Sequence, residues 1–524
     1  MIFTILGYIW LILKPILFCI LALLLKRVLE AVMLISRVNF YKNQKINTRY
    51  YRLSFLDDLR FIPFLIGINM PFTPKHCNPK SNFKPEERKD VCLKNNFQFK
   101  NKVEVVLIGT ELIKEFHKVE TKVITKTLKK SDSEFLGFVN KMGPAAQEGR
   151  MVLKQVFRLD KLKVMMPKIK QVVKRHVAAV KSRVAKQAGG QLKGRLTMDL
   201  FAPIVNKISY SLLLGNDDPK EYQVNGKDFS STVVQMVFSA MMPDPMDVMT
   251  FGLWGMLGLN KNMKKFRTLR KEIKKVLKNE YNRRLELKKA GKKWEKDSSN
   301  LMDILITEFN EDGELPGDEE FDKLLGYMEI FQFAAADTTQ QTLSSFFTLM
   351  GMSKHKKIYK DLQDAIKREL PQEDYTYDDL LACDTVGRYV RELMRLLPTA
   401  NGTFSRMAVK DFKVGTLKVK KGDLVSVSIN DNMKDESEFD NPFEFRPSRW
   451  TEEKRKGLAK TQYIPFSSGS RDCVGKLLAE FVVRLLIVEV AKEFNFELVK
   501  DETAVGPTTN FKRGRREINI SLAN

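Results

Sequence analysis

The sequence is poor in the residues and motifs that mark several large classes of protein. It has only five cysteines, an odd number at irregular spacings, so we expect free thiols in a reducing compartment rather than a disulfide-stapled scaffold. Its four histidines lie too far apart for a HExxH or zinc-finger pattern. No GxxxxGKS/T loop, GxSxG elbow or strand-linked GxGxxG is found. These absences remove support for zinc-enzyme, ATPase, serine-hydrolase and dinucleotide-binding interpretations.

What the chain does have is length and positive charge. Its 524 residues can bury a large core, and 89 basic side chains against 64 acidic ones give a formal net charge of +25. The bases gather in residues 150–200, where the acids are Asp160 and Asp199, and in residues 261–296. Both stretches are predicted as long amphipathic helices, whose charged faces are either solvated surface or a docking face for an acidic protein or anionic lipid. Nucleic acid is not expected as a partner, because no aromatic-interleaved basic motif accompanies the charge.

The amino terminus is strongly apolar. Residues 1–25 are interrupted by charge only at Lys14, and Lys26 and Arg27 follow at once. An apolar run of this length can span a bilayer, and the cations after it place the rest of the chain on the cytoplasmic side. We expect a membrane anchor at 1–27, a linker at 28–60 and a catalytic domain at 61–524. A cleaved signal peptide is the alternative, but the small residues of a cleavage site are missing. The second apolar segment, 251–259, is either a buried loop or a further membrane contact.

The body of the chain has mainly helical periodicity. Apolar residues recur at helical spacing from about 110 to 400. Alternation typical of strands is found in residues 412–429 and 517–522, where Gly415 and Gly422 interrupt the first run. The expected fold class is therefore mainly α with a smaller β portion.

One cysteine has surroundings that favour chemistry. Cys473 lies in a glycine-containing loop, residues 465–475, directly before an apolar helical run. A sulfur at a helix amino terminus meets the positive end of the dipole, so we expect a lowered pKa and a ligand or nucleophile. Gly469 and Gly475 would allow a large flat group to approach the backbone, and Arg471 could pair with an anion. Haem, with its iron and two propionates, needs this combination.

The same loop carries a family resemblance. Phe466, Gly469, Arg471, Cys473 and Gly475 match the pattern FxxGxRxCxG and resemble the haem-thiolate loop of the cytochrome P-450 superfamily. Glu392 and Arg395 look like the ExxR pair of that family, and the run from Phe445 to Trp450 looks like its FxPxRF element. The resemblance implies a cytochrome P-450-like fold in which Glu392, Arg395 and Arg449 form a buried ion network. It also implies haem b with Cys473 as its axial thiolate.

A polar segment lies within an apolar helical run, from about Leu324 to Leu349. Asp337 and Thr338 are unfavourable there unless their side chains satisfy carbonyls or handle protons. The segment resembles the proton-delivery segment of the long helix over the haem of the family, with Ala335 where a glycine is usual. The resemblance makes Asp337 and Thr338 the expected catalytic residues.

Basic residues that bind the haem propionates are also implied by the resemblance. Arg471 is the first candidate, Arg406 the second and Lys154 the third. The WxxxR pair of the family has no tryptophan here, and Lys154 lies in the nearest matching segment.

The implied activity is that of a monooxygenase of the endoplasmic reticulum membrane that hydroxylates a lipophilic small molecule. The chain has no flavin or nicotinamide motif, so electrons must come from a partner, expected to be an NADPH-dependent flavoprotein reductase that docks on the basic stretch 150–200. Two alternatives stay open: haem-thiolate isomerase, dehydratase or peroxygenase chemistry without a reductase, and a non-enzymatic basic membrane protein whose Cys473 is merely structural.

Overall fold

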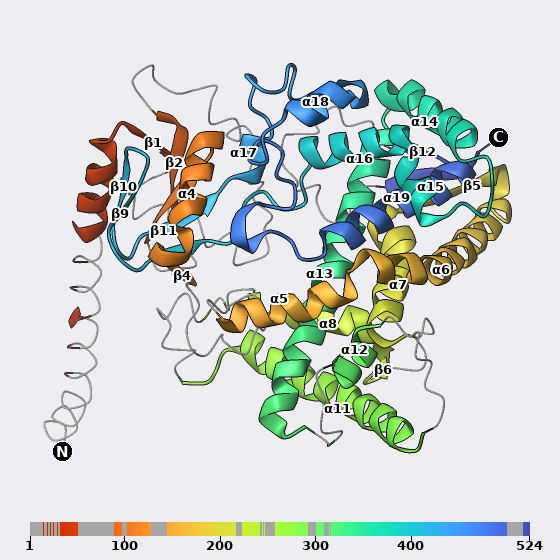
Figure 1. The fold of residues 1–524 in the computed structure, drawn as a ribbon, viewed down its shortest axis with the longest axis horizontal. Helices are drawn as coiled ribbons and strands as arrows, with labels where there is room; N and C mark the ends of the chain where they lie inside the picture. The colour runs from red at the N-terminus through yellow and green to blue at the C-terminus, as the bar shows by residue number, and fades with distance from the viewer. Residues whose placement is uncertain are drawn as a thin grey trace, which may run out of the picture. The chain divides into compact units, whose positions relative to one another are not determined.

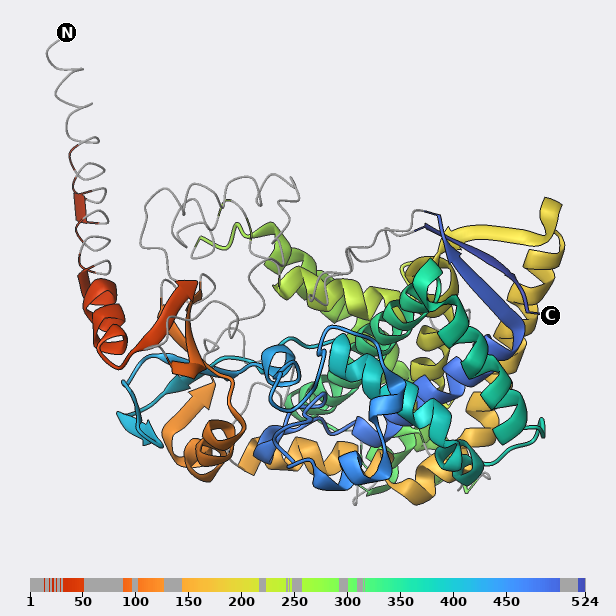
Figure 2. The same cartoon turned by 90° about the horizontal axis from the view of Figure 1, so that it is seen from above.

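The computed structural model describes most of the chain, in several separate stretches. They are residues 14, 18, 21, 22, 25, 29, 32–50, 88–96, 102–126, 144–215, 223–241, 244, 246, 257–291, 300–308, 314, 316–499 and 517–523. The chain divides into two compact units (Figures 1 and 2). Unit 1 is Met1–Thr127 with Gly402–Asn432, and unit 2 is Leu128–Asn401 with Met433–Asn524.

Unit 1 is built on a mixed sheet in the order β1-β2-β3-β11-β8-β4. Its central strands β3 and β11 are parallel, and β8 pairs antiparallel with β11 and β4. A separate hairpin, β9 and β10, contacts helix α4. The bounds are β1 Ile46–Tyr50, β2 Arg88–Asn96, β3 Lys102–Leu107, α4 Thr110–Val123, β4 Ile124–Lys126, β8 Arg406–Ala408, β9 Phe412–Val414, β10 Leu417–Val419, β11 Leu424–Val427 and α17 Ile429–Asn432.

Helical residues 32–42 are held to unit 1 by polar contacts with the turn after β10. The Tyr41 hydroxyl donates to the Asp423 carboxylate at 2.6 Å, and Arg37 lies 3.5 Å from the same carboxylate. Gln44 exchanges two hydrogen bonds with the backbone of Lys418. The segment predicted as a linker therefore includes residues that contact the β9–β10 hairpin and the turn after it.

Unit 2 holds most of the helices. A three-stranded antiparallel sheet, β12-β13-β5, and the short hairpin β6-β7 complete it. The helices are α5 Pro144–Val156, α6 Leu159–Ala185, α7 Ala202–Leu214, α8 Phe229–Met241, α11 Lys261–Lys289, α12 Leu301–Glu308, α13 Asp318–Met350, α14 Lys356–Glu369, α15 Tyr377–Ala382, α16 Asp384–Leu396, α18 Glu452–Gly457 and α19 Lys476–Glu493. The strands are β5 Gln191–Arg195, β6 Gln223–Val224, β7 Lys227–Asp228, β12 Phe494–Leu498 and β13 Glu517–Leu522.

Helices α13 and α19 run through the core of unit 2. The first turn of α13 carries Asp318, Glu319 and Glu320, whose negative charges favour a helix amino terminus. Helix α19 is apolar around most of its circumference, as a helix covered on all sides should be, and Leu485 and Ile487 are fully buried. The two helices contact one another. Helices α13 and α19 therefore form a buried centre of unit 2.

The prediction of a mainly helical chain with a smaller β portion is confirmed. Strands occupy the alternating runs at 412–429 and 517–522, and α13 contains the predicted helical run from Leu324 to Leu349. The prediction of continuous helix over 150–200 is wrong at its end. There the chain turns at Gly189 and Gly190, both with positive φ, and enters β5, which pairs with β13 more than 300 residues later. Pairing with so distant a partner leaves little trace in local periodicity.

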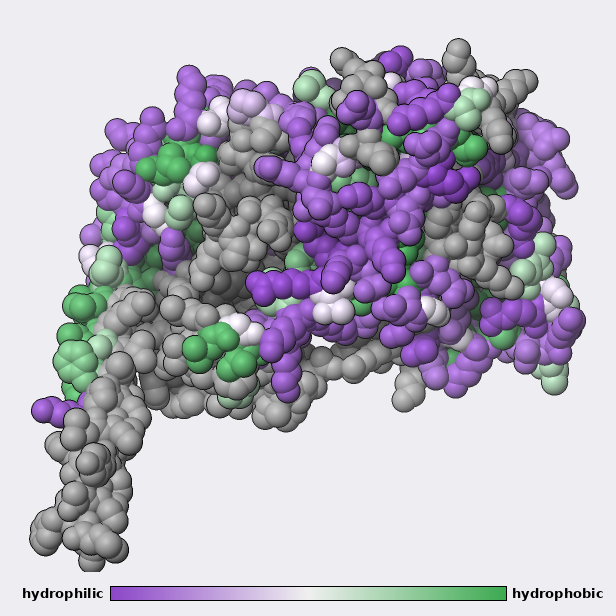
Figure 3. Space-filling model, turned by 90° about the horizontal axis from the view of Figure 1, so that it is seen from below, coloured by the Kyte–Doolittle hydropathy of each residue, from purple (hydrophilic) through white to green (hydrophobic). Residues whose placement is uncertain are grey.

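The anchor predicted for residues 1–27 lies largely outside the described residues. Within the stretches that are described, no helix has the length and apolar composition needed to cross a bilayer. Leu29, Val32 and Met33 nevertheless expose large apolar side chains on the amino-terminal helix. Figure 3 shows a group of hydrophobic residues, coloured green, at its left edge. Most of the second apolar segment, 251–259, is also outside the described residues; Leu257 and Leu259 are exposed just before α11.

Candidate active site

The cysteine loop is held in one conformation by its own backbone. The N–H of Cys473 donates to the carbonyl of Phe466 at 2.9 Å, which closes the loop between these two residues. Ser467 and Gly469 both have positive φ, and Gly469 begins a short 3-10 turn that ends at Arg471. Glycine adopts this backbone region without strain, which explains its place in the motif. The Cys473 thiol is free and exposed, although helix α19, which begins three residues later, is mostly buried.

The prediction of a lowered pKa for Cys473 is wrong for the chain without a metal. Loss of hydration among the surrounding atoms raises the pKa of the thiol, and the neighbouring Asp472 charge adds to that effect. The N–H of Gly475 and the cations Arg150 and Lys476 lower the pKa, but by less. The sulfur precedes the helix amino terminus instead of lying within its first turn, so the dipole acts only weakly. A bound metal ion would have to supply the stabilisation of the thiolate.

Helix α5 supplies a contact that sequence reasoning missed. Arg150 donates from Nη1 to the carbonyl oxygen of Asp472 at 2.7 Å and from Nη2 to the carboxylate of Asp472 at 2.6 Å. Lys154, the residue predicted on this helix, is exposed one turn later. A basic residue four positions before Lys154 was available as a signal, but only the fold brings residues 150 and 472 together.

Within the long helix α13, an exposed strip interrupts an otherwise buried surface. Ala334 and Thr338 lie one turn apart and are exposed. Asp337 and Thr339, the two neighbours of Thr338 in the sequence, are buried. The Thr338 hydroxyl donates to the carbonyl of Ala334 at 2.7 Å, and the Asp337 carboxylate accepts from the Gln341 amide at 2.8 Å. Both side chains therefore form hydrogen bonds within helix α13. The sequence left open whether they do this or handle protons.

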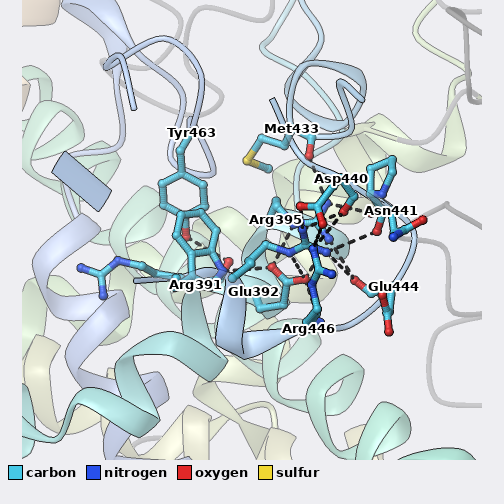
Figure 4. A network of polar contacts seen from close by, with 12 residues as sticks. Arg391, Glu392, Arg395, Met433, Asp440, Asn441, Glu444, Arg446 and Tyr463 are labelled. Carbon is cyan, nitrogen blue, oxygen red and sulfur yellow. Dashed lines mark hydrogen bonds and ion pairs between the residues drawn. The ribbon is translucent and has the colours of Figure 1, made fainter. Parts of the chain in front are cut away.

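The predicted ion network of Glu392, Arg395 and Arg449 is confirmed (Figure 4). One oxygen of Glu392 accepts from Arg395 Nη2, Arg449 Nε and the backbone N–H of Arg446, each at 2.9 Å. The other accepts from Arg395 Nε and Trp450 Nε1, also at 2.9 Å. Arg395 further donates to the carbonyls of Met433, Pro442 and Glu444, so the network ties helix α16 to the segment that leads toward the cysteine loop.

The remaining predicted site residues have different surroundings. Arg471 is half-buried in the 3-10 turn next to Cys473, and Phe466 packs against the core of unit 2. Gly475 is the N-cap of α19. Arg406 belongs to unit 1, where it is buried and its Nη1 lies 2.6 Å from Glu120. Its Nε is also buried and has no hydrogen-bond partner in the described structure.

These observations test whether the residues fit a haem group. An exposed cysteine on a closed loop offers a ligand, and the exposed strip of α13 carries the small side chain of Ala334. Arg406 belongs to unit 1 and stays a predicted propionate partner; its buried Nε has no hydrogen-bond partner in the described structure. The residues of unit 2 fit haem, with Cys473 as the candidate ligand and Arg471 as a candidate propionate partner.

A mainly helical chain with a cysteine loop before a buried helix and an ExxR network is the architecture of a haem-thiolate protein. The family comparison agrees with it: the cytochrome P450 family matches residues 94–520, and the chain belongs to this family. Members carry haem b with a cysteine thiolate as axial ligand, so haem b is the cofactor of this chain. Homologues in the family are typically haem monooxygenases.

Individual relatives match a shorter part of the chain. Cytochrome P450 3A15 of Cavia porcellus is 29% identical over 180 residues, which are 34% of this chain and 35% of that relative. Cytochrome P450 3A11 of Mus musculus is 32% identical over 173 residues, or 33% of this chain and 34% of the relative. The putative cytochrome P450 CYP13A3 of Caenorhabditis elegans is 30% identical over 178 residues, 34% of each. The match thus spans about a third of the length of these curated relatives.

A solved structure extends the likeness in fold to most of the chain. Retinoic acid-bound cyanobacterial CYP120A1 superposes with a TM-score of 0.63 at 20% sequence identity, covering 83% of this chain and 92% of that one. At this identity the likeness concerns the fold alone.

Proposed function

We propose that this chain is a haem-thiolate monooxygenase that hydroxylates a lipophilic small molecule with electrons from an NADPH-dependent flavoprotein reductase. The observation that carries the proposal is the exposed thiol of Cys473, held by a closed loop at the head of a buried helix. When bound, haem supplies the activation of dioxygen and the transfer of one oxygen atom to a C–H bond. Cys473 as a thiolate would donate electron density to the iron and favour O–O cleavage over simple oxygen carriage.

Thr338 and Asp337 are proposed to control protons. The Thr338 hydroxyl is exposed and already uses its proton toward the Ala334 carbonyl, so a small rotation would let it pass a proton to a water molecule in the exposed strip. The buried Asp337 carboxylate, held by Gln341, would relay a proton: it would accept one from water and pass it on beside Thr338. The reaction needs protons as well as electrons, and these are the ionisable and hydroxyl groups that α13 offers beside the strip.

The reductase is proposed to dock on the basic residues of α5 and α6. Several cations of this stretch already have intramolecular partners: Lys163 pairs with Asp378, Lys174 with Glu373 and Lys181 with Glu493. All three pairs include exposed side chains, so they are weak and can exchange for charges on an acidic partner. Reduction by the reductase should therefore slow as salt concentration rises, and a rate independent of salt would contradict this docking face.

The exposed apolar side chains of the amino-terminal helix support attachment to a membrane. Leu29, Val32 and Met33 would cost free energy in water and gain it in lipid. We therefore propose that the protein is anchored in the endoplasmic reticulum membrane by residues 1–27, with its catalytic part in the cytoplasm. Co-sedimentation of the full chain with liposomes, compared with a chain that lacks residues 1–27, tests the anchor. Equal sedimentation would contradict it.

The ligand assignment is tested with two matched cysteine variants. Cys473→Ser should abolish the ferrous carbon monoxide band of thiolate-bound haem, because a hydroxyl cannot replace the thiolate. Cys383→Ser is the control: Cys383 is buried and donates to Glu369, and burial raises its pKa to about 12, so it is a structural thiol. An unchanged band in Cys473→Ser would refute the ligand.

The same preparation separates the activity from its alternatives. Full-length protein with reductase and NADPH should convert a lipophilic compound that also shifts the haem absorption band on binding. Screening fatty acids, sterols, terpenoids and xenobiotics for such shifts would identify the substrate class. Product formation without NADPH would favour isomerase, dehydratase or peroxygenase chemistry. A folded chain that never retains haem would favour the non-enzymatic alternative.

A further inference from the structure

Two arginines from different helices of unit 2 meet over a glycine. Arg391 belongs to α16 and Arg484 to α19, and these two helices contact one another. A Cβ placed on Gly387 of α16 would lie 3.0 Å from Nη2 of Arg484 and 3.4 Å from Nη1 of Arg391. Both nitrogens thus lie close to one point, and the missing side chain of Gly387 leaves room for both guanidinium groups.

These two guanidinium groups differ from their neighbours in having no carboxylate partner. In the part of the chain that the structure describes, no carboxylate oxygen lies within 4.0 Å of either group. By contrast, Arg388 and Arg455 each pair with Asp384 at 2.6 Å. The described residues therefore bring the positive charges of Arg391 and Arg484 together without an opposite charge in contact with either.

Arg484 is also buried, since only 8% of its surface is exposed. Its Nη1 donates to the carbonyl of Leu381 at 3.2 Å, whereas its buried Nε has no hydrogen-bond partner in the described structure. Burial lowers the pKa of Arg484, the charge of Arg391 lowers it further, and Glu480 partly opposes both effects from beyond ion-pair distance. Because buried polar groups nearly always have partners, a buried cation with a free donor indicates an acceptor that the chain does not supply.

The surroundings of the two arginines favour a small oxyanion as that acceptor. A guanidinium presents its N–H donors in a planar fork that matches two oxygens of a phosphate group, and two forks can hold one tetrahedral anion. Figure 4 shows the side chain of Arg391 directed away from Glu392 and its partners. Arg391 is half-buried, so a free ion can enter beside it, whereas a carboxylate carried by another protein would not reach the nearly covered Arg484.

We propose that Arg391 and Arg484 form a binding site for inorganic phosphate between α16 and α19. The anion accepts hydrogen bonds from both guanidinium groups, including the buried Nε of Arg484, and balances their charges. Helix α16 carries Glu392 and Arg395, and α19 follows Cys473, so the bound anion joins the two helices and stabilises the folded chain. The site goes beyond the proposed monooxygenase function and does not depend on the haem assignment.

The first test is equilibrium dialysis of the full-length, haem-loaded protein against radiolabelled phosphate, in chloride buffer of constant ionic strength. The wild type should bind one phosphate per chain. Arg484→Met and Arg391→Gln should each bind it about tenfold more weakly, because each loses charge-assisted hydrogen bonds. The control is Arg158→Gln, whose guanidinium already has a partner, Asp160 at 3.1 Å, and which should match the wild type. No saturable binding to the wild type, or equal binding by all four proteins, overturns the proposal.

The second test is the urea midpoint with and without phosphate, which separates an anion site from a purely structural arginine. Without phosphate, the wild type keeps a buried unpaired cation, so Arg484→Met should unfold at the same urea concentration or a higher one. Phosphate should raise the wild-type midpoint in a saturable way, beyond the general salt effect that Arg484→Met also shows. If Arg484→Met lowers the midpoint equally in both buffers, Glu480 balances the guanidinium within the chain and the proposal is overturned.

Discussion

Replacement of Glu392 by glutamine should be among the most destabilising single changes in unit 2. Glu392 and Arg395 have fully buried side chains, and that of Arg449 is 3% exposed. The carboxylate accepts five hydrogen bonds at 2.9 Å, three on one oxygen and two on the other. In glutamine, one of these oxygens becomes an amide N–H₂ group that faces at least two donors.

The magnitude follows from the charges that remain. Without the negative charge of Glu392, the buried guanidinium of Arg395 retains only carbonyl partners. Breaking a buried ion pair in this way costs about 3–5 kcal/mol. Because a folded domain is stable by only about 5–15 kcal/mol in total, the variant should lose about a fifth or more of the stability of the unit.

The assay is denaturant unfolding followed by tryptophan fluorescence, to which Trp450 contributes; its indole N–H donates to Glu392. The control is Glu452→Gln, which removes the same charge from an exposed pair with Lys456 and should cost less than about 1 kcal/mol. The midpoint of Glu392→Gln should fall well below that of the control with a similar denaturant slope. If both variants unfold within about 1 kcal/mol of each other, the argument from the buried network is refuted.

Three further changes probe other parts of the molecule. Burial raises the pKa of Asp423 to about 6, whereas the carboxyl of the unfolded chain loses its proton near pH 4. The free energy of unfolding should therefore fall by up to about 3 kcal/mol as the pH rises from about 4 to about 6. Asp423→Asn should remove this pH dependence from the urea midpoints. If the urea midpoints of the wild type and of Asp423→Asn depend equally on pH, the raised pKa of Asp423 is refuted. Thr338→Val should leave ligand-induced spectral shifts intact but lower product formed per NADPH roughly tenfold or more, whereas unchanged coupling would exclude a proton-handling role. Leu485→Ala, at a fully buried position of α19, should cost about 2–5 kcal/mol in the same unfolding assay, and a cost below about 1 kcal/mol would mean that the core closes the cavity.

The local signals in the sequence were informative wherever the chemistry is local. The closed loop from Phe466 to Cys473 depends on glycines at positive φ, and the pair of Glu392 and Arg395 depends on i, i+3 spacing along one helix. Both were readable without a structure. The strands at 412–429 and 517–522 could also be predicted from the sequence, because the alternation of apolar and polar residues is a pattern between neighbouring residues.

The pKa of Cys473 shows where local reasoning failed. The sequence placed the thiol near a helix amino terminus, which predicts a lowered pKa. The raised pKa instead reflects the loss of hydration at the sulfur, together with the charge of Asp472. The loss of hydration depends on all the atoms that lie near the sulfur in the folded chain, and a local stretch of sequence does not specify them.

The sequence by itself determined the motifs, the ligand candidate and the helical character, since these depend on residue type and spacing along one segment. Only the tertiary structure decided that Arg150 holds the residue before Cys473, that β5 joins β13, and that Arg406 keeps a buried donor without a partner. The first two are contacts between residues hundreds of positions apart, and the third is a missing hydrogen bond at a buried atom. Such contacts are set by how helices and strands pack, because packing joins surfaces whose partners local periodicity does not specify.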